Sequence, residues 1–352
     1  MFAAVLLSHV ALAGAPLVAV ATEHDVTVHD VYGAGVVSGD LGVGAVDDLD
    51  RTENGHYLYG IGAHTLPFRA PAGTGTVVGI SAPTRVTTGR AIDVQAGGGK
   101  VWTADGDVLR ADVHTDFRLQ SGAVDPTTRT DWLDGVAMDA RTGHVWSVHD
   151  AFPVTYLLRT DPLARTTDRP WKGPRTHELT TATFDHLEPH PDGGVVFTHY
   201  QTGYYLEWAA VEHVDGSGQV DTLRLGSTSP PVDLAVDPVH DVLWVGQADG
   251  TVTEVDLQSG LQAIRDLPFQ DLEALAVGPH GDLWVAADQS LWHLPAGSQD
   301  LVEHAGAWTG DVVDMVVLEV PSDWSDSPLK PDHDLEGATV EDDGPEWGGL
   351  LD

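Results

Sequence analysis

One short motif recurs along this chain and constrains its fold more than any other feature of the sequence. A large apolar residue, usually Trp, follows a turn signal and small apolar residues, and it returns roughly every 40 to 50 residues. The central residues of the six copies are Leu58, Trp102, Trp146, Phe197, Trp244 and Trp284. A repeat of this length is one small unit that stacks on its neighbours to bury a core. The period therefore outweighs the length of 352 residues, and we expect one domain rather than two.

The clearest copy of the unit lies between Pro231 and Gly260. This stretch contains an apolar strand, a second strand around Trp244, a turn at Gly250 and a third strand ending at Leu257. Three short antiparallel strands in so few residues make up most of one blade of a β-propeller. The sequence therefore predicts an all-β protein of the propeller class.

The number of blades follows from the apolar strand that precedes each copy. Six such strands occupy residues 44–50, 91–95, 134–140, 184–190, 232–238 and 272–279. A seventh, Val312–Val320, has no Trp copy after it and needs partners from elsewhere in the chain. Propellers avoid an unpaired edge by completing one blade from both chain ends. We therefore predict a seven-bladed β-propeller closed by strands from both chain ends, with a six-bladed ring as the alternative.

The apolar N-terminus contains three candidates for the outer strands of the closing blade, namely Phe2–His9, Pro16–Ala21 and Val26–Tyr32. A signal peptide and a membrane anchor are the alternatives for the first of these residues. No basic residue precedes Arg51, and polar residues interrupt the apolar run. We therefore find no convincing signal peptide and expect no membrane span.

Three parts of the chain follow from this interpretation. We assign residues 1–44 to the closing strands, 45–320 to the propeller repeats and 321–352 to an acidic C-terminal tail. The boundary at 320 is where the chain becomes acidic and loses its periodicity.

Two stretches resemble the propeller repeats of two-component regulators, namely GDLWVAADQSLWHLP at 281–295 and HDVLWVGQADGTVTEVD at 240–256. They carry the Gly-x-Leu-Trp-Val pattern and the Gly-x-Val-x-x-x-Asp pattern of that family. The resemblance covers these two units well and the other units loosely. It implies a β-propeller fold, but such relatives serve as sensors, adhesive modules and enzymes, so it implies no single function.

The charge of the chain is extreme, with 54 acidic residues, 17 basic ones and a formal net charge of -37. Regular apolar strands between the charges indicate that the carboxylates coat a folded surface. Concentrated salt screens the self-repulsion of such a surface, so we expect a halophilic source, haloarchaeal or haloviral. Nucleic acid is excluded as a partner because no basic face exists to replace the counterions of its phosphates. The absence of Cys excludes disulfides and zinc–thiolate sites.

An acidic residue falls early in each of the seven first strands. The seven are Asp47, Asp93, Asp134, Asp185, Asp233, Glu273 and Asp314. If these strands line a central channel, the carboxylates form an acidic ring near one of its mouths. Two interpretations stay open at this point: the ring binds a cation, or each carboxylate accepts backbone hydrogen bonds from the neighbouring blade.

His186, Glu188 and His190 alternate along one predicted strand, which places their side chains on one face. Imidazole and carboxylate groups bind divalent metals, and His199 on the next strand is a suitable fourth ligand. We therefore identify these residues as a candidate site for a divalent cation, the only cofactor that the sequence suggests. Histidines satisfied by ordinary hydrogen bonds are the alternative.

A basic, Pro-rich stretch contrasts with the acidic chain. It contains Arg165, Arg169, Trp171, Lys172 and Arg175. We expect a loop whose cationic and aromatic tip binds a carboxylate-rich protein or an acidic glycan. Pairing with the protein's own surface acids is the alternative. In the acidic tail, Trp347 and Leu350 are apolar anchors typical of a docking peptide, and we expect them to contact this loop on another copy or protein.

These features favour a non-enzymatic interaction or structural module of a larger assembly, at a virion or a cell surface. Its expected partners are proteins, including copies of itself. A metal-dependent lyase or hydrolase built on His186, Glu188 and His190 is the alternative, and a ligand sensor is the third possibility. No sialidase box, no Gly-x-Ser-x-Gly elbow and no phosphate-binding Gly loop occurs in the sequence.

Overall fold

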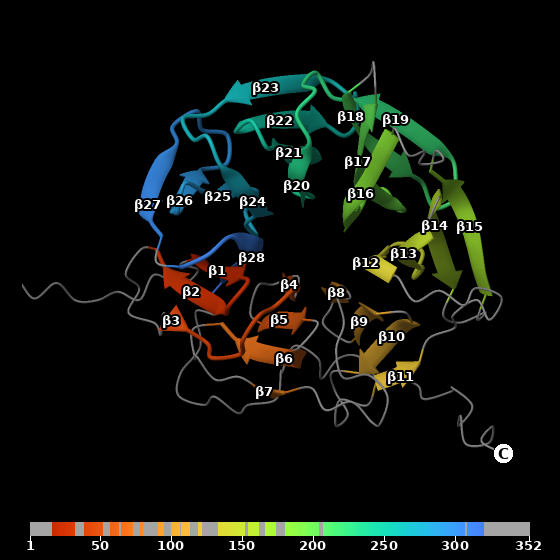
Figure 1. Ribbon diagram of the computed structural model, residues 1–352, viewed down its shortest axis with the longest axis horizontal. Coiled ribbons are helices and arrows are strands. Elements are labelled where there is room, and N and C mark those ends of the chain that lie inside the picture. Colours follow the sequence, from red (N-terminus) through yellow and green to blue (C-terminus); the bar gives the residue numbers. More distant parts are fainter. Residues whose placement is uncertain are drawn as a thin grey trace, which may run out of the picture.

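Every element of the fold is a β-strand over the part of the chain that the computed structural model describes (Figure 1). The described residues are 16–31, 39–51, 57–62, 65–72, 78–79, 91–94, 100–105, 107–112, 119–121, 133–151, 154–161, 166–173, 180–203, 207–306 and 308–319. Their strands form seven four-stranded sheets, and each sheet is open rather than closed into a barrel. The all-β prediction is confirmed.

Each sheet collects strands that follow one another in the sequence, except the one that contains the last strand. That sheet has the order β28 (Val312–Glu319), β1 (Pro16–Thr22), β2 (Val26–Asp30) and β3 (Gly39–Asp40). The next three sheets are β4 (Asp48–Arg51), β5 (Tyr57–Gly62), β6 (Thr65–Pro71) and β7 (Val78–Gly79); β8 (Ala91–Val94), β9 (Lys100–Asp105), β10 (Asp107–Asp112) and β11 (Leu119–Ser121); and β12 (Leu133–Met138), β13 (Val145–Ala151), β14 (Val154–Asp161) and β15 (Thr166–Lys172). The remaining three are β16 (Thr180–Pro189), β17 (Val195–Gly203), β18 (Trp208–Val214) and β19 (Val220–Arg224); β20 (Pro231–Asp237), β21 (Val242–Gln247), β22 (Thr251–Asp256) and β23 (Gln262–Asp266); and β24 (Leu272–Val277), β25 (Leu283–Ala287), β26 (Ser290–Leu294) and β27 (Val302–Ala305).

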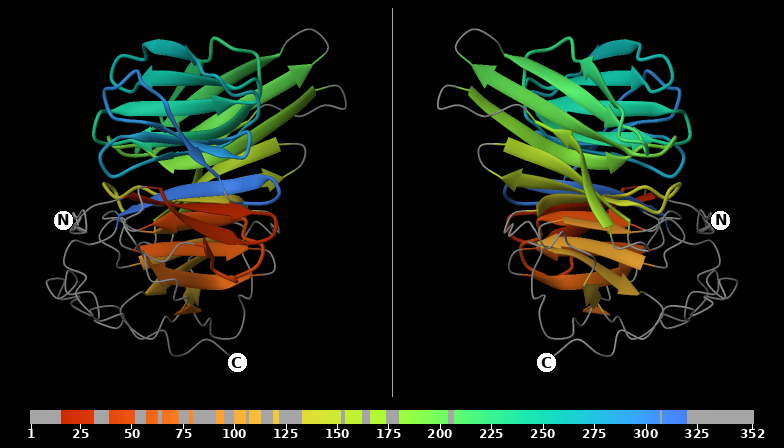
Figure 2. Two further views of the ribbon diagram at one scale, coloured as in Figure 1. Left: turned by 90° about the vertical axis from the view of Figure 1, so that its left-hand side faces the viewer. Right: turned by 90° about the vertical axis from the view of Figure 1, so that its right-hand side faces the viewer.

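The innermost strand of each sheet lies nearest the centre of the molecule, and the others lie progressively outward (Figure 1). Neighbouring inner strands contact each other, as β4 does with β8 and β20 with β24, and β28 contacts both β24 and β4. In the side views, the last strand (blue) lies beside the first strands (red), with which it shares a sheet (Figure 2). Repeated antiparallel sheets around a common centre are consistent with a β-propeller.

The recurring aromatic residue fills the space between neighbouring sheets. Trp284 in β25 is fully buried and packs in one cluster with Val18 and Met315 of the adjoining sheet. Trp146 in β13 is also fully buried and shares a cluster with Phe197 of β17. Because Trp146 and Trp284 bury their area in layers between two sheets, the spacing of the repeat in the sequence follows the spacing of these layers.

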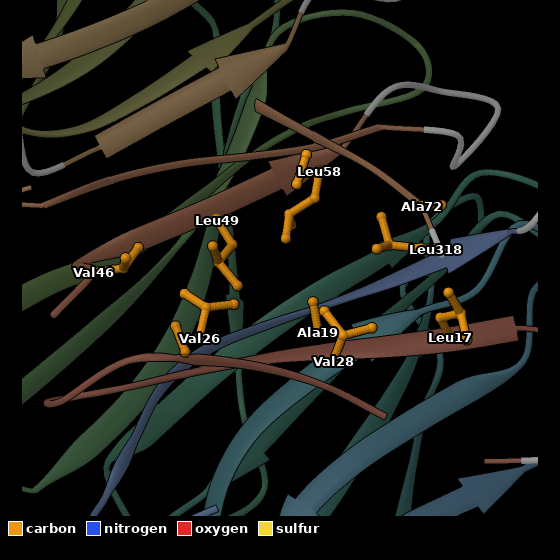
Figure 3. Close-up of a cluster of buried hydrophobic side chains, with 11 residues drawn as sticks. Leu17, Ala19, Val26, Val28, Val46, Leu49, Leu58, Ala72 and Leu318 are labelled. Atoms are coloured by element: carbon orange, nitrogen blue, oxygen red, sulfur yellow. The ribbon is translucent and has the colours of Figure 1, made fainter. Parts of the chain in front are cut away.

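An apolar cluster lies between the sheet with the last strand and the sheet that follows it in the sequence. Antiparallel pairing between β1 and β28 places Leu17 opposite Leu318. Leu17, Ala19 and Leu318 pack with Leu49 of β4 and Leu58 of β5 (Figure 3). The contact joins the N-terminal and C-terminal strands to the sheet that follows β3 in the sequence.

Two of the expected N-terminal strands, Pro16–Ala21 and Val26–Tyr32, correspond to β1 and β2. The strand expected at Val312–Val320 corresponds to β28. The candidate strand Phe2–His9 and the tail at 321–352 lie outside the described residues. Within the described ranges, no helix is long and apolar enough to cross a membrane.

Candidate functional site

A central cavity of about 600 Å³ is lined by the inner strands of the seven sheets. β4, β8, β12, β16, β20, β24 and β28 all contribute residues to its wall. Asp48, Asp233 and Asp314 are among its acidic lining residues, and Arg51 is one of its cations. Because side chains from every sheet meet here, this cavity is the candidate functional site.

Acidic side chains of the inner strands bind backbone amides of the following sheet. The bonds join Leu49 N to Asp314 Oδ2 at 2.6 Å, Ile92 N to Asp48 Oδ2 at 2.7 Å, Leu275 N to Asp233 Oδ2 at 2.7 Å and Val312 N to Glu273 Oε2 at 3.0 Å. In each pair the amide donates, the carboxylate accepts, and the two residues belong to neighbouring sheets. We call these four acids the sheet-linking carboxylates. Each bond satisfies a backbone amide of the next sheet, so the four bonds brace adjoining sheets at the cavity wall.

At the first position the acid that links two sheets is Asp48, one residue after the predicted Asp47. Asp48 in β4 makes the bond, whereas the predicted Asp47 is exposed and precedes the strand. The predicted residues Asp233, Glu273 and Asp314 make such bonds themselves. Sequence alone does not distinguish two consecutive Asp residues, because only the backbone register decides which one faces the next sheet.

The seven predicted acids do not share one row of the sheets. Asp93 in β8 lies opposite Trp102, whereas the residue opposite Trp244 is Ala235, two positions beyond Asp233. The predicted residues Asp134 and Asp185 lie in β12 and β16, each beside a shift in strand register. A bulge inserts one extra residue into a strand. Equal positions in two copies of the sequence repeat then no longer lie at equal positions in the two sheets.

Asp48 and Asp314 form a pair of interacting carboxyl groups in the cavity wall. Desolvation raises the pKa of Asp314 to about 7, and the charge of Asp233 acts in the same direction, against the hydrogen bond from Asp48. Desolvation, followed by the charge of Asp314, raises the pKa of Asp48 well above its ordinary value. Near neutral pH the pair therefore retains a proton that two solvated carboxyl groups would have lost.

Arg51 connects two sheets across the same cavity. Its Nη2 donates a hydrogen bond to the backbone oxygen of Val277 in β24 at 3.3 Å. Desolvation lowers the pKa of the guanidinium, and the charges of Asp50 and Glu188 oppose this shift. The guanidinium thus lies between the backbone oxygen of Val277 and the negative charges of nearby carboxylates.

The structure does not assemble the metal site predicted at His186, Glu188, His190 and His199. Among the described residues, which include all four, no three His, Asp or Glu side chains are grouped so that they could hold a metal ion. His186 adopts a left-handed backbone conformation with φ of 57° at a bulge in β16, and its Nδ1 lies 3.2 Å from Asp233 Oδ1. The extra residue breaks the alternation on which the common face depended. Nothing in the sequence marks this bulge.

The other two histidines of that set have separate partners. His190 stacks on His213 with ring centroids 4.0 Å apart. Desolvation, with a smaller contribution from His213, lowers the pKa of His190 to about 4. His199 is buried, and its Nδ1 lies 3.4 Å from Glu212 Oε1. The two histidines therefore have different neighbours and do not share a metal-binding position.

The described part of the basic stretch is the outermost strand β15 rather than a loop. Trp171 is only 9% exposed and packs edge-on against Phe197, with ring centroids 5.0 Å apart, so it does not form an exposed tip. Neighbouring side chains of a strand point to opposite faces, and Lys172 is exposed. The charged groups of Arg169 and Lys172 lie 5.1 and 5.8 Å from the ring of Tyr156. Outside the described residues lie Arg165, Arg175, Trp347 and Leu350.

Comparison with known proteins places the fold in a broad class. No family model matches the chain, and no curated protein matches its sequence. Hydrazine synthase from Kuenenia stuttgartiensis matches with a TM-score of 0.59 at 14% identity, covering 81% of this chain and 90% of that one. AztD from Citrobacter koseri matches with a TM-score of 0.57 at 13% identity, covering 87% and 98%. A chain of a nidogen–laminin complex matches with a TM-score of 0.50 at 9% identity, covering 86% and 98%.

All three similar structures are propeller-like, and at these identities the likeness concerns the fold alone. The protein is therefore a β-propeller-like module with repeated sheets.

Proposed function

We propose that the seven sheets are the blades of one closed, seven-bladed propeller. The support is the position of β28, which pairs with β1 along its length and contacts the inner strands β4 and β24 on either side. In such a ring the N-terminal strands complete the blade that begins with the last strand of the sequence. Closure from both ends removes the unpaired edges that would otherwise favour aggregation.

We further propose that this ring is a non-enzymatic interaction module of a larger assembly. The observation that carries the proposal is the use of the sheet-linking carboxylates, whose oxygens bind amides of the cavity wall. A catalytic acid or base must lie within hydrogen-bond reach of the substrate proton that it transfers. Groups committed to the backbone instead stiffen the ring, and a stiff ring presents its outer surfaces in a fixed arrangement.

The outer strand β15 is the partner-binding surface in this proposal. Arg169 and Lys172 are exposed on it and flank the ring of Tyr156, on a protein whose formal net charge is -37. Cations beside an aromatic ring attract carboxylates and orient an approaching partner. We therefore propose an acidic protein surface as the partner, including a second copy of this chain.

In this proposal the protein works in concentrated salt, at the surface of a virion or a cell. Salt screens repulsion among the 54 acidic residues and leaves short-range contacts at an interface largely intact. One of the structures with a similar fold comes from a complex between two proteins, nidogen and laminin. That example supports protein binding as a use of the fold.

Sedimentation velocity of the full chain in molar KCl tests the proposed association. We expect a species heavier than the 37.4 kDa monomer. The double variant Arg169→Glu with Lys172→Glu should weaken association at least tenfold, most strongly at the lowest salt that keeps the protein folded. Arg224→Glu is the matched control, because Arg224 is also exposed on an outer strand, with its Cζ 5.2 Å from the ring of Trp208. A wild type that stays monomeric, alone and when mixed with the proteins of its own source, contradicts the proposal.

A further inference from the structure

A second cavity, of about 830 Å³, lies between two neighbouring sheets and shares no lining residue with the central cavity. Its wall contains residues of β2 on one side, of β27 on the other, and of the segment that leads into β28. We call it the inter-sheet groove. A cavity of this size is in the range of small-molecule sites.

Two of the residues that line this groove, His29 and Trp308, each carry a buried nitrogen atom that has no hydrogen-bond partner among the described residues. The atoms are Nε2 of His29 and Nε1 of Trp308. The two residues are 8% and 7% exposed, and their rings meet edge to face with centroids 5.5 Å apart. A buried polar atom without a partner is destabilising, so native proteins usually supply a partner from the protein, a ligand or an ordered water.

Whether each nitrogen donates or accepts a hydrogen bond determines which ligand group can pair with it. The indole N–H of Trp308 only donates, so its partner must be an acceptor. Desolvation lowers the pKa of His29, which keeps its ring neutral. A neutral imidazole nitrogen either donates or accepts, according to the tautomer. One hydroxyl group can serve both residues, because it accepts and donates at the same atom.

The remaining wall argues against a charged ligand of either sign. Asp30, Asp40 and Glu303 line the groove and repel an anion. These carboxylates would attract a simple cation, but a cation would leave the Trp308 donor without an acceptor. A hydroxyl group suits both, since it can donate to a carboxylate and accept from the indole. The hydroxyls of Thr27 and Thr309 add further partners of the same kind.

We propose that the inter-sheet groove binds a neutral, hydroxyl-rich ligand of the saccharide class, with Trp308 and His29 at its buried end and carboxylates along its wall. The site is independent of the partner surface on β15. It gives the protein a second binding activity, the recognition of a neutral sugar unit.

Saturation-transfer NMR and calorimetric titration of the full chain in molar KCl test this site. The probes are the methyl glycosides of glucose, mannose, galactose and N-acetylglucosamine, with glucuronate as the anionic probe and choline as the cationic probe. We expect at least one neutral glycoside to bind with a dissociation constant below about 10 mM, as suits a single sugar unit. Neither glucuronate nor choline should bind at the same concentration.

Variants place the binding in the groove. Trp308→Phe, which keeps a ring but removes the N–H, should weaken binding at least tenfold. Trp292→Phe is the matched control, because Trp292 also has an unpartnered Nε1 but packs near Phe269 and does not line the groove. The proposal is overturned if no neutral glycoside binds the wild type at 50 mM or so. Equal binding by Trp308→Phe and wild type also overturns it, because the sugar then binds elsewhere. A response to choline alone overturns it as well, because the groove then binds a cation.

Discussion

Replacing Asp233 with Ala tests whether the sheet-linking carboxylates hold neighbouring sheets together. The Asp233 side chain is 13% exposed and accepts hydrogen bonds from Leu275 N in the next sheet and from Leu234 N, each at 2.7 Å. Its other close contact is His186 Nδ1 at 3.2 Å. The substitution therefore removes the acceptor of two backbone amides and the carboxylate beside His186.

The size of the effect follows from the burial of the two amides. Leu275 is 3% exposed and Leu234 is 2% exposed, so little water can replace the lost carboxylate. An unsatisfied buried amide costs about 1–3 kcal/mol, and we expect Asp233→Ala to lower the free energy of unfolding by about 2–5 kcal/mol. Asp233→Asn retains one oxygen acceptor and should recover roughly half of that loss.

Urea unfolding in molar KCl, followed by tryptophan fluorescence, measures these differences. Asp221→Ala is the control, since Asp221 is exposed on the outer strand β19, and it should change stability by no more than about 0.5 kcal/mol. If Asp233→Ala and Asp221→Ala unfold at the same urea concentration, the inter-sheet bond at Asp233 carries no stability, and the bracing role is refuted.

Three further perturbations have expected outcomes. The folded-state pKa of Asp314, about 7, lies above its ordinary value of 3.8, so its contribution to stability is full below about pH 4 and is lost as the pH rises through 7. Asp314→Asn should flatten this decline in urea midpoints between pH 5 and 8, and an unchanged slope would assign the decline to other groups. Trp284→Ala should lower the free energy of unfolding by about 3–5 kcal/mol, because its fully buried ring fills an inter-sheet layer. Dialysis from molar KCl into dilute buffer should abolish the strand signal in circular dichroism, since 54 acidic residues then repel unscreened; full retention of that signal would contradict the halophilic interpretation.

The strands could be predicted from the sequence because their signal is repeated. Trp146, Phe197 and Trp284 each lie in the second strand of a sheet, and the apolar run before each of them forms the innermost strand. A large buried side chain between sheets is a requirement of packing, and packing recurs with every copy. The all-β class and the repeat can therefore be predicted from the residue pattern alone.

The candidate site was less predictable because it depends on single-residue shifts of the backbone. His186 occupies a bulge, which turns it toward Asp233 and away from the face that an unbroken strand would give it. A bulge adds one residue to a strand and has no signature in the amino-acid composition. It nevertheless moves every later side chain of that strand to the opposite face. Asp47 and Asp48 illustrate the same limit, since only register decides which carboxylate reaches the next sheet.

The basic stretch shows a different limit. Its Pro and Arg residues are typical of a loop, but in the fold its described part pairs with β14 as an outer strand. An edge strand tolerates Pro, because one of its sides has no ladder to complete. Trp171 then packs into the core, and only the flanking cations stay at the surface.

An engineered disulfide between β1 and β28 tests the closed ring most directly. The chain has no Cys, and Ala19 lies directly opposite Val316 in the antiparallel pairing of these strands. Ala19→Cys with Val316→Cys should form an intramolecular disulfide under mild oxidation of the folded protein and stabilise it by a few kcal/mol, roughly 2–5, because the bond closes a very long loop. Ala19→Cys with Val317→Cys is the control, since neighbouring side chains of β28 point to opposite faces, and it should stay reduced. If the first pair stays reduced in the folded protein, or if the two pairs oxidise equally, β1 and β28 are not paired in this register, and the ring is not closed by the two ends of the chain.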